Sequence, residues 1–128
     1  MALVRLSVVI PALNEAQGIT AALTALAPLM LRGAQVVVAD GGSSDDTVAL
    51  AQAGGAAVIA SPRGRALQMN AGARQASGEL LLFLHADTLL PDQADALIAQ
   101  ALSGRRRVWG RFDVSISGRP ALLRVIAA

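Results

Sequence analysis

His85 and Asp87 are the residues whose types and spacing are best suited to chemistry. They follow Leu80–Leu84, a run of apolar residues without a polar break. On an extended segment, residues two apart project to the same side, so the imidazole and the carboxylate can share a divalent cation or bind a polar substrate. A structural histidine is the alternative for His85, because hard Mg²⁺ prefers oxygen ligands and Mn²⁺ tolerates imidazole better.

A second carboxylate, Asp40, ends the expected buried strand Gln35–Ala39 and is followed by Gly41 and Gly42. A carboxylate there can accept hydrogen bonds from a nucleobase N–H or a ribose hydroxyl. The two glycines let a ligand approach the backbone closely. The alternative is an ordinary acidic turn before a capped helix.

Two further polar clusters accompany them. Asn14 and Glu15 follow the first apolar run of the chain, and Arg63 and Arg65 flank Gly64 just before a helical pattern. Two guanidiniums beside a helix amino terminus favour an anion such as a phosphate. A solvated loop is the alternative for the arginines.

These clusters need a scaffold that brings them together, and the apolar pattern predicts one. We expect strands at residues 3–10, 35–39, 56–60, 80–84 and 108–116, and helices at residues 15–27, 46–53, 66–76 and 91–102. This alternation predicts an α/β fold with a mostly parallel sheet and helices on both faces. The unbroken run 80–84 indicates a central strand buried on both faces. Ligands of such sheets bind at the carboxyl ends of the strands.

Local signals predict where several elements end. Pro11 is expected to end the first strand, because proline has no N–H for the ladder. Asn14 is expected to cap the first helix, and Ser43 or Ser44 to cap the second. Pro28 is expected to close the first helix.

Composition narrows the class of protein. The chain has 128 residues, 54% of them hydrophobic and 16% charged, which indicates one domain with a packed core. There is no cysteine, so neither a disulfide nor a thiolate metal site can form. The net charge is +2 and every basic residue is arginine, a side chain suited to phosphate and carboxylate. Aromatic residues make up only 2%, which argues against nucleic-acid binding by base stacking.

Several common classes lack their motifs here. The sequence contains no G-x-x-x-x-G-K-[ST], no G-x-G-x-x-G after the first strand and no G-x-S-x-G. These absences argue against a P-loop NTPase, an ordinary dinucleotide dehydrogenase and an α/β-hydrolase. No apolar run reaches the roughly 18 residues that span a bilayer. With no secretory signal pattern either, the cytoplasm is the expected compartment.

The ordered motifs resemble a known family. Ser7–Glu15, Val38–Thr47 and Leu82–Thr88 resemble the three signature segments of family-2 glycosyltransferases with the GT-A fold. Arg63–Ala73 resembles the segment that the family carries between them. The sequence His85-Ala-Asp-Thr88 is most similar to the small bacterial subgroup described as rSAM/selenodomain-associated transferase 2. The resemblance covers about residues 3–116.

This resemblance implies a nucleotide-diphosphate-sugar donor. Asp87 matches the last Asp of the family's D-x-D metal motif, whereas His85 replaces the first. A divalent cation, Mg²⁺ or Mn²⁺, is therefore expected at Asp87, with His85 as a second candidate ligand. The residues implied to bind the donor are Pro11, Ala12, Asn14, Glu15, Asp40, Gly41, Arg65 and Asp87.

The family's acceptor half, with its general base, follows the region matched here. Residues 1–128 are therefore expected to be the donor-binding half of a longer enzyme, with no catalytic base assigned within them. Two alternatives stay open, a nucleotidyltransferase and a non-catalytic nucleotide-binding or assembly module. The nucleotidyltransferase is disfavoured because its early Gly/Arg/Lys-rich loop is absent after the first strand.

The apolar residues near the end of the chain suggest association. Residues 121–128 are expected to begin a helix that carries Leu122, Leu123, Val125 and Ile126. An exposed apolar patch of that kind marks an interface, so self-association through this segment is expected, as a symmetric homodimer or by exchange of the segment between copies. The alternative is a short helix that starts at Pro120 and folds back on its own sheet.

Overall fold

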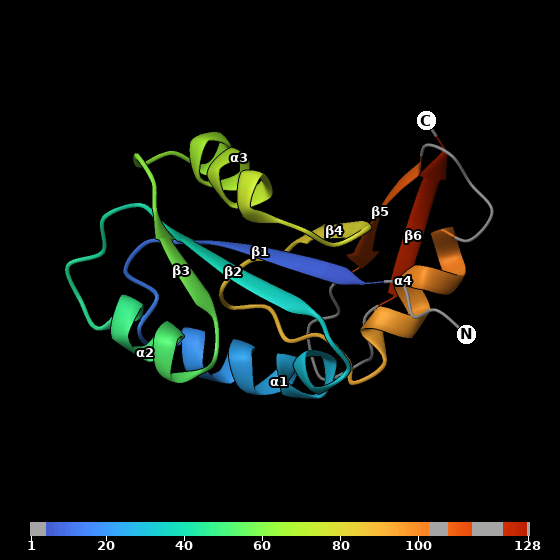
Figure 1. Cartoon of the computed structure of the whole chain (residues 1–128), viewed down its shortest axis with the longest axis horizontal. Helices are drawn as coiled ribbons and strands as arrows, with labels where there is room; N and C mark the ends of the chain where they lie inside the picture. The colour runs from blue at the N-terminus through green and yellow to red at the C-terminus, as the bar shows by residue number, and fades with distance from the viewer. Residues whose placement is uncertain (1–4, 103–107, 114–121, 128) are drawn as a thin grey trace.

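The computed structural model describes residues 5–102, 108–113 and 122–127. Four strands form one parallel sheet in the order β3-β2-β1-β4 (Figure 1). The strands are β1 (Leu6–Ala12), β2 (Gln35–Asp40), β3 (Ala57–Ala60) and β4 (Leu80–Phe83). The helices are α1 (Ile19–Leu31), α2 (Thr47–Ala53), α3 (Arg65–Gln75) and α4 (Ala94–Leu102). The predicted α/β fold is confirmed.

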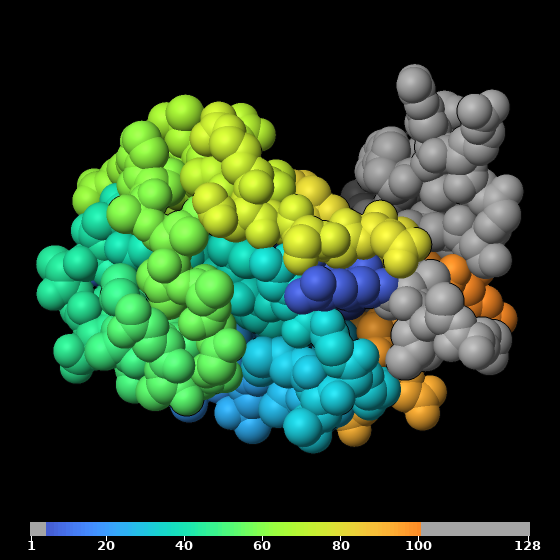
Figure 2. Space-filling view, in the orientation of Figure 1, coloured from blue at the N-terminus to red at the C-terminus, as the bar shows by residue number. Residues whose placement is uncertain are grey.

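Helices cover both faces of the sheet, and β1 shows why. Val8 and Ile10 of β1 belong to the same buried cluster as Leu23 of α1. Val9, which points to the opposite face, lies against Gly72 of α3. In Figure 1, α1 and α2 accordingly lie on one side of the strands and α3 on the other. In the space-filling view, only a small dark-blue patch from the start of the described chain shows between neighbouring segments (Figure 2), because every residue of β1 except Pro11 is buried.

α3 approaches β1 closely because Gly72 has no side chain. A Cβ added at Gly72 would lie 2.3 Å from Cγ1 of Val9, far inside any normal contact. Gly72 therefore lets α3 lie directly on the sheet. The approach matters for the site, because α3 begins with Arg65 at the carboxyl ends of the strands.

The position of β4 corrects one prediction. The run 80–84 was expected to form a central strand buried on both faces, but β4 lies at an edge of the described sheet. Leu81 and Phe83 are 44% and 40% exposed, whereas Leu80 and Leu82 pack against the core. An apolar run predicts a strand but does not determine how many of its faces are covered. The central strands are β1 and β2.

Pro11 lies within β1 instead of ending it. Because N–H and C=O groups alternate in direction along a strand, Pro11 faces the same side as Val9, whose carbonyl accepts from the N–H of Leu84 next to β4. β4 does not extend as far as Pro11, so the missing N–H costs no ladder bond there. β1 continues along β2 as far as Ala12.

The helix boundaries also differ from the predictions. α1 begins after Gly18 and continues through Pro28, because Leu29 beyond the proline is still a core residue. Asn14 does not cap it. α2 follows Asp46, and neither Ser43 nor Ser44 is its capping residue. These side chains hold the loops at the sheet edge instead, as described below.

The end of the chain forms a strand where a helix was expected. β6 (Leu122–Ala127) pairs antiparallel with β5 (Val108–Asp113) in a separate two-stranded sheet. The helical prediction for residues 121–128 is therefore wrong where the structure describes them. Residues 103–107 and 114–121, including the end of the strand predicted at 108–116, lie outside the described part. Association through this segment stays a prediction.

Within the described residues, no helix combines the length and hydrophobicity needed to cross a membrane.

The close approach at Gly72 gives a stability prediction. Gly72→Ala should destabilise the fold by about 1–3 kcal/mol, because the added methyl group overpacks the α3–β1 contact. Chemical denaturation measures the change. Gly18→Ala is the matched control, since its added Cβ would meet its nearest atom at 3.5 Å, an ordinary contact. Equal stability of the two variants would mean that α3 lies farther from β1 than described.

Candidate functional site

The polar clusters predicted from the sequence meet at one edge of the sheet. β1, β2 and β4 run parallel, so their carboxyl ends point the same way. Ala12 at the end of β1 is in register with Asp40 at the end of β2. A Cβ built on Gly18, which follows β1, would lie 3.8 Å from Cβ of Asp87. The segment after β4 therefore lies against the start of α1, and the expectation that Asp40 and Asp87 share an edge is confirmed.

Asp40 organises the turn after β2. It is only 7% exposed. Its Oδ2 accepts hydrogen bonds from the N–H groups of Gly42 (3.1 Å) and Ser43 (2.9 Å), and its Oδ1 accepts from Oγ of Ser43 (2.5 Å). Each carboxylate oxygen can accept more than one bond, so Oδ1 retains acceptor capacity beyond the turn. Asp40 thus fixes the loop and still offers an acceptor at the sheet edge.

Asn14 joins the loop after β1 to the loop after β2. Its backbone has a φ of 53°, a left-handed conformation that asparagine tolerates better than most residues. Its Oδ1 accepts from the N–H of Ser44 (2.8 Å), and its own N–H donates to Oγ of Ser43 (2.8 Å). The next N–H, that of Glu15, donates to Oγ1 of Thr47 (2.8 Å). The two loops therefore form one polar unit.

Asp45 strengthens the same connection. Its Oδ2 accepts from the N–H of Ala16 (3.2 Å), and its Oδ1 accepts from the N–H and the hydroxyl of Thr47. The hydroxyl of Thr47 holds the pKa of the Asp45 carboxyl below its usual range. Ser43 and Ser44, predicted to cap a helix, instead join two loops together with Thr47.

Arg65 and His85 face each other at the mouth of a small cavity. Nη1 of Arg65 lies 3.3 Å from Nε2 of His85. A guanidinium can only donate, so Nε2 accepts and the proton of a neutral imidazole is on Nδ1. The cavity has a volume of about 140 Å³ and an apolar floor. It is lined by Pro11, Arg65, Met69, Phe83, Leu84 and His85.

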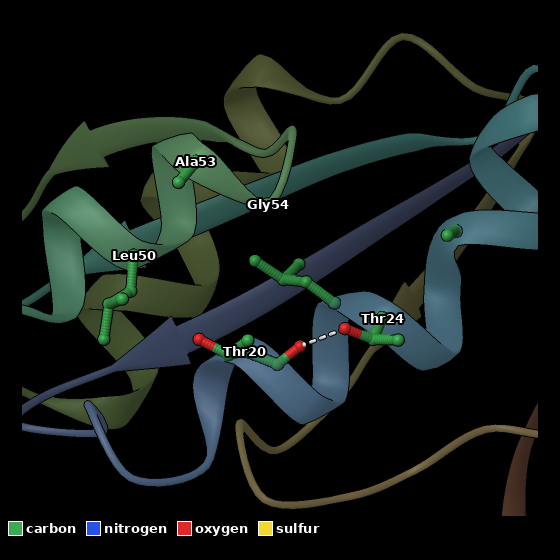
Figure 3. A pocket seen from close by; sticks show the side chains of 7 residues that line it. Thr20, Thr24, Leu50, Ala53 and Gly54 are labelled. Carbon is green, nitrogen blue, oxygen red and sulfur yellow. Dashed lines mark hydrogen bonds between the residues drawn. The ribbon is translucent and has the colours of Figure 1, made fainter.

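A larger cavity lies elsewhere. It measures about 340 Å³ and lies between α1 and α2 (Figure 3). It is lined by Thr20, Leu23, Thr24, Ala27, Leu50, Ala53 and Gly54. This lining contains no charged side chain and none of the predicted site residues. The smaller cavity beside Arg65 is therefore the better candidate for a functional site.

A divalent cation fits this edge only with help from a ligand. Within the described residues, no three His, Cys, Asp or Glu side chains gather as a ready-made metal site. Nε2 of His85 already faces Arg65, whereas Asp87 is exposed. Mg²⁺ and similar ions are commonly held by one or two carboxylates together with phosphate oxygens of the substrate. Asp87 fits that mode, and it does not fit a site built from protein ligands alone.

The segment that carries His85 and Asp87 is anchored at its far end by an ion pair. Nε and Nη2 of Arg32 donate to the two carboxylate oxygens of Asp95, each at 2.8 Å, and Nη2 also donates to the carbonyl of Asp92. Arg32 follows α1 and Asp95 lies in the first turn of α4. The pair therefore ties the start of α4 to the end of α1, and it fixes where the segment after β4 ends.

Comparisons with known proteins agree with the fold. The family model described as glycosyl transferase family 2 matches residues 7–126. No curated protein matches the chain in sequence. Glucosyl-3-phosphoglycerate synthase from M. tuberculosis superposes with a TM-score of 0.68 at 28% identity, over 79% of this chain and 41% of that one. Its complex with Mn²⁺, uridine diphosphate and phosphoglyceric acid gives a TM-score of 0.70 at 26% identity, over 80% and 40%.

A second protein gives a similar result. TarS from S. aureus, residues 1–349, superposes with a TM-score of 0.68 at 25% identity, over 77% of this chain and 32% of that one. The chain thus spans less than half the length of each of these structures.

The anchoring ion pair gives a pH prediction. The hydrogen bonds from Arg32 hold the pKa of Asp95 below its usual value of 3.8. A carboxyl whose folded pKa is depressed stabilises the fold above its unfolded pKa, and this contribution is lost as pH falls through the folded pKa. Asp95→Asn should therefore lower the free energy of unfolding at pH 7 and flatten its decline below about pH 4.

Denaturation midpoints measured between pH 7 and pH 2 test this expectation. Glu79→Gln is the matched control, because Glu79 is an exposed carboxylate before β4, at the opposite end of that strand. The denaturation midpoint of Glu79→Gln should change with pH as that of the wild type does. An Asp95→Asn profile that is parallel to the wild type throughout would mean that the ion pair contributes nothing to folding.

Proposed function

This chain belongs to glycosyl transferase family 2, and we propose that it binds a nucleotide-diphosphate sugar as the donor for sugar transfer. One observation carries the proposal. The parallel sheet brings a buried carboxylate with a glycine turn, Asp40–Gly42, to the same edge as Arg65 and Asp87. These groups suit the two polar parts of such a donor, the nucleoside and the diphosphate.

The nucleoside end of the donor is assigned to β1 and β2. Oδ1 of Asp40 can accept a bond from a nucleobase N–H or a ribose hydroxyl in addition to its bond from Ser43. Gly41 lies next to Asp40 in this turn, and Pro11 offers an apolar wall in the adjacent cavity. Ala12, Asn14 and Glu15 complete this side of the proposed site. The M. tuberculosis synthase binds uridine diphosphate, which supports uridine as the base to test first.

The diphosphate end is assigned to Arg65 and Asp87. The guanidinium of Arg65 lies beside the cavity and can donate to phosphate oxygens. Asp87 would hold a divalent cation jointly with the diphosphate, and the cation would stabilise the charge of the leaving group. The synthase was crystallised with Mn²⁺ or Mg²⁺ and uridine diphosphate, which supports this assignment. His85 orients Arg65 in this arrangement, because its Nε2 accepts from the guanidinium.

The proposed reaction is displacement at the anomeric carbon of the donor by an acceptor hydroxyl. The residues of this chain would hold the donor and stabilise the departing diphosphate, a form of electrostatic catalysis. We assign residues 1–128 to the donor half of a glycosyltransferase domain. The likeness covers only 41% of the synthase, so acceptor and base are not assigned to residues of this chain. Within the family, the sequence from His85 to Thr88 supports the assignment of this chain to the rSAM/selenodomain-associated transferase 2 subgroup.

The assignment of Asp40 can be tested without disturbing its turn. Asp40→Asn keeps one oxygen to accept from Gly42 and Ser43, and its new amide can donate to Oγ of Ser43. Loss of the charged acceptor should weaken uridine diphosphate binding by roughly tenfold or more. Isothermal titration calorimetry measures the affinity, with guanosine diphosphate as a second ligand.

Asp46→Asn is the matched control, because Asp46 is an exposed carboxylate in the same loop. Its affinity for the nucleotide should equal that of the wild type. Unchanged affinity in Asp40→Asn would remove Asp40 from the nucleoside site.

The metal assignment predicts mutual dependence of cation and nucleotide. Mn²⁺ should bind weakly to the chain alone and at least about tenfold more tightly with uridine diphosphate, because the phosphates supply missing oxygen ligands. Electron paramagnetic resonance of free Mn²⁺ measures this dependence. Asp87→Asn should abolish the increase, and Glu79→Gln should retain it. Equally tight Mn²⁺ binding with and without nucleotide would contradict the shared site.

A further inference from the structure

Gln68 is a buried amide whose hydrogen-bonding groups face backbone partners from three parts of the site. It lies on α3 and is only 5% exposed. Its Nε2 donates to the carbonyls of Ala12 (2.9 Å) and Ala39 (3.0 Å), and its Oε1 accepts from the N–H of Gly64 (3.2 Å). The orientation of the amide is determined, because two carbonyls can only accept and an N–H can only donate. A buried amide is expensive unless satisfied in this way.

The partners of Gln68 lie beside the residues of the proposed site. Ala12 ends β1, and its carbonyl also accepts from the N–H of Gly41 (3.0 Å). Ala39 directly precedes Asp40, and Gly64 directly precedes Arg65. The single amide therefore connects the end of β1, the backbone that leads into the Asp40 turn and the start of α3.

Two glycines let the amide reach this place. A Cβ on Gly41 would lie 2.9 Å from Cδ of Gln68 and 3.0 Å from its Nε2 and Oε1. Gly72, one helical turn after Gln68, allows α3 to lie directly on Val9 of β1. Gly41 therefore leaves the space that the amide of Gln68 occupies. This packing accounts for a glycine at position 41, whose φ is not in the left-handed region.

We propose that Gln68 is a positioning residue that sets the distance between the nucleoside-binding turn at Asp40 and the diphosphate-binding Arg65. The proposal rests on the proposed function, since it assigns the two ends of one nucleotide to the two sides of this cross-link. Both sides must be held together for one ligand to contact both, and pre-organisation of this kind raises affinity. Gln68 itself does not touch the ligand.

The test measures uridine diphosphate affinity in single and double variants of the full chain. Gln68→Met keeps the side-chain length without hydrogen bonds, and Gln68→Glu places a carboxylate against two carbonyls. Both should bind uridine diphosphate about tenfold more weakly at pH 8, as expected when a buried hydrogen-bond network is broken. Gln75→Glu, an exposed change on the same helix, should bind like the wild type.

A pH series separates positioning from simple loss of structure. A protonated glutamic acid carries one O–H donor, so Gln68→Glu should regain affinity relative to the wild type as pH falls from 8 to 5. Gln68→Met should not. Gly41→Ala should also weaken binding, because its methyl group displaces the amide of Gln68. In the double variant Gly41→Ala/Gln68→Met that amide is already absent. The double variant should therefore lose less binding free energy than the sum of the losses in the two single variants.

A readout without nucleotide distinguishes failure of this proposal from failure of the proposed function. Amide hydrogen exchange at Gly64 and Gly41 should accelerate in Gln68→Met and stay at the wild-type rate in Gln75→Glu.

If the wild-type chain binds neither uridine diphosphate nor guanosine diphosphate, the proposed function is refuted, whatever the exchange rates. Folded Gln68→Met with wild-type nucleotide affinity, or without faster exchange at Gly64, would overturn the positioning role. A lower melting temperature at unchanged affinity would leave Gln68 as a stabilising residue alone.

Discussion

The pairing of β1 with β2 as far as Ala12 and Asp40 is the constraint on which the rest of the site depends. A parallel ladder fixes both strands in direction and register, so the loops that follow them must leave the sheet side by side. Hydrogen bonds between Asn14 and Ser44, and between Glu15 and Thr47, then become possible. Every other feature of the sheet edge is added to this pair. β4 joins β1 on its other side, and α3 crosses above both central strands.

The polar groups at this edge form bonds mainly with the backbone. Asp40 accepts from two N–H groups of its own turn, Asp45 binds the neighbouring loop, and Gln68 binds two strand carbonyls. No buried side-chain nitrogen or oxygen in the described residues lacks a partner. Such an edge is rigid at its base, where the strands end. The exposed groups include the guanidinium of Arg65 and the carboxylate of Asp87, which are suited to charged ligands.

Small residues make this arrangement possible. Gly72 brings α3 onto Val9, and Gly41 leaves room for the amide of Gln68. At the opposite end of the sheet, Gly78 allows the chain before β4 to lie close to β1, because a Cβ at Gly78 would lie 2.7 Å from Oγ of Ser7. Close-packed interiors tolerate few added atoms, so these glycines fix how near the helix and the strands lie. The site geometry therefore depends as much on missing side chains as on those that bind.

The sequence by itself determined the alternation of strands and helices from β1 to β5, the parallel sheet and the edge at which Asp40, Arg65 and Asp87 meet. Apolar periodicity is a local property. Strands that alternate with helices are expected to run parallel, so their carboxyl ends share an edge. It did not determine that β4 is an edge strand, that residues 122–127 form a strand, or that Pro11 belongs to β1. These depend on which neighbour a strand finds, a contact between residues far apart in the chain. The role of Gln68 was hidden for the same reason. A glutamine in a helical pattern looks exposed, and only the tertiary structure places carbonyls of two strands within reach of its amide.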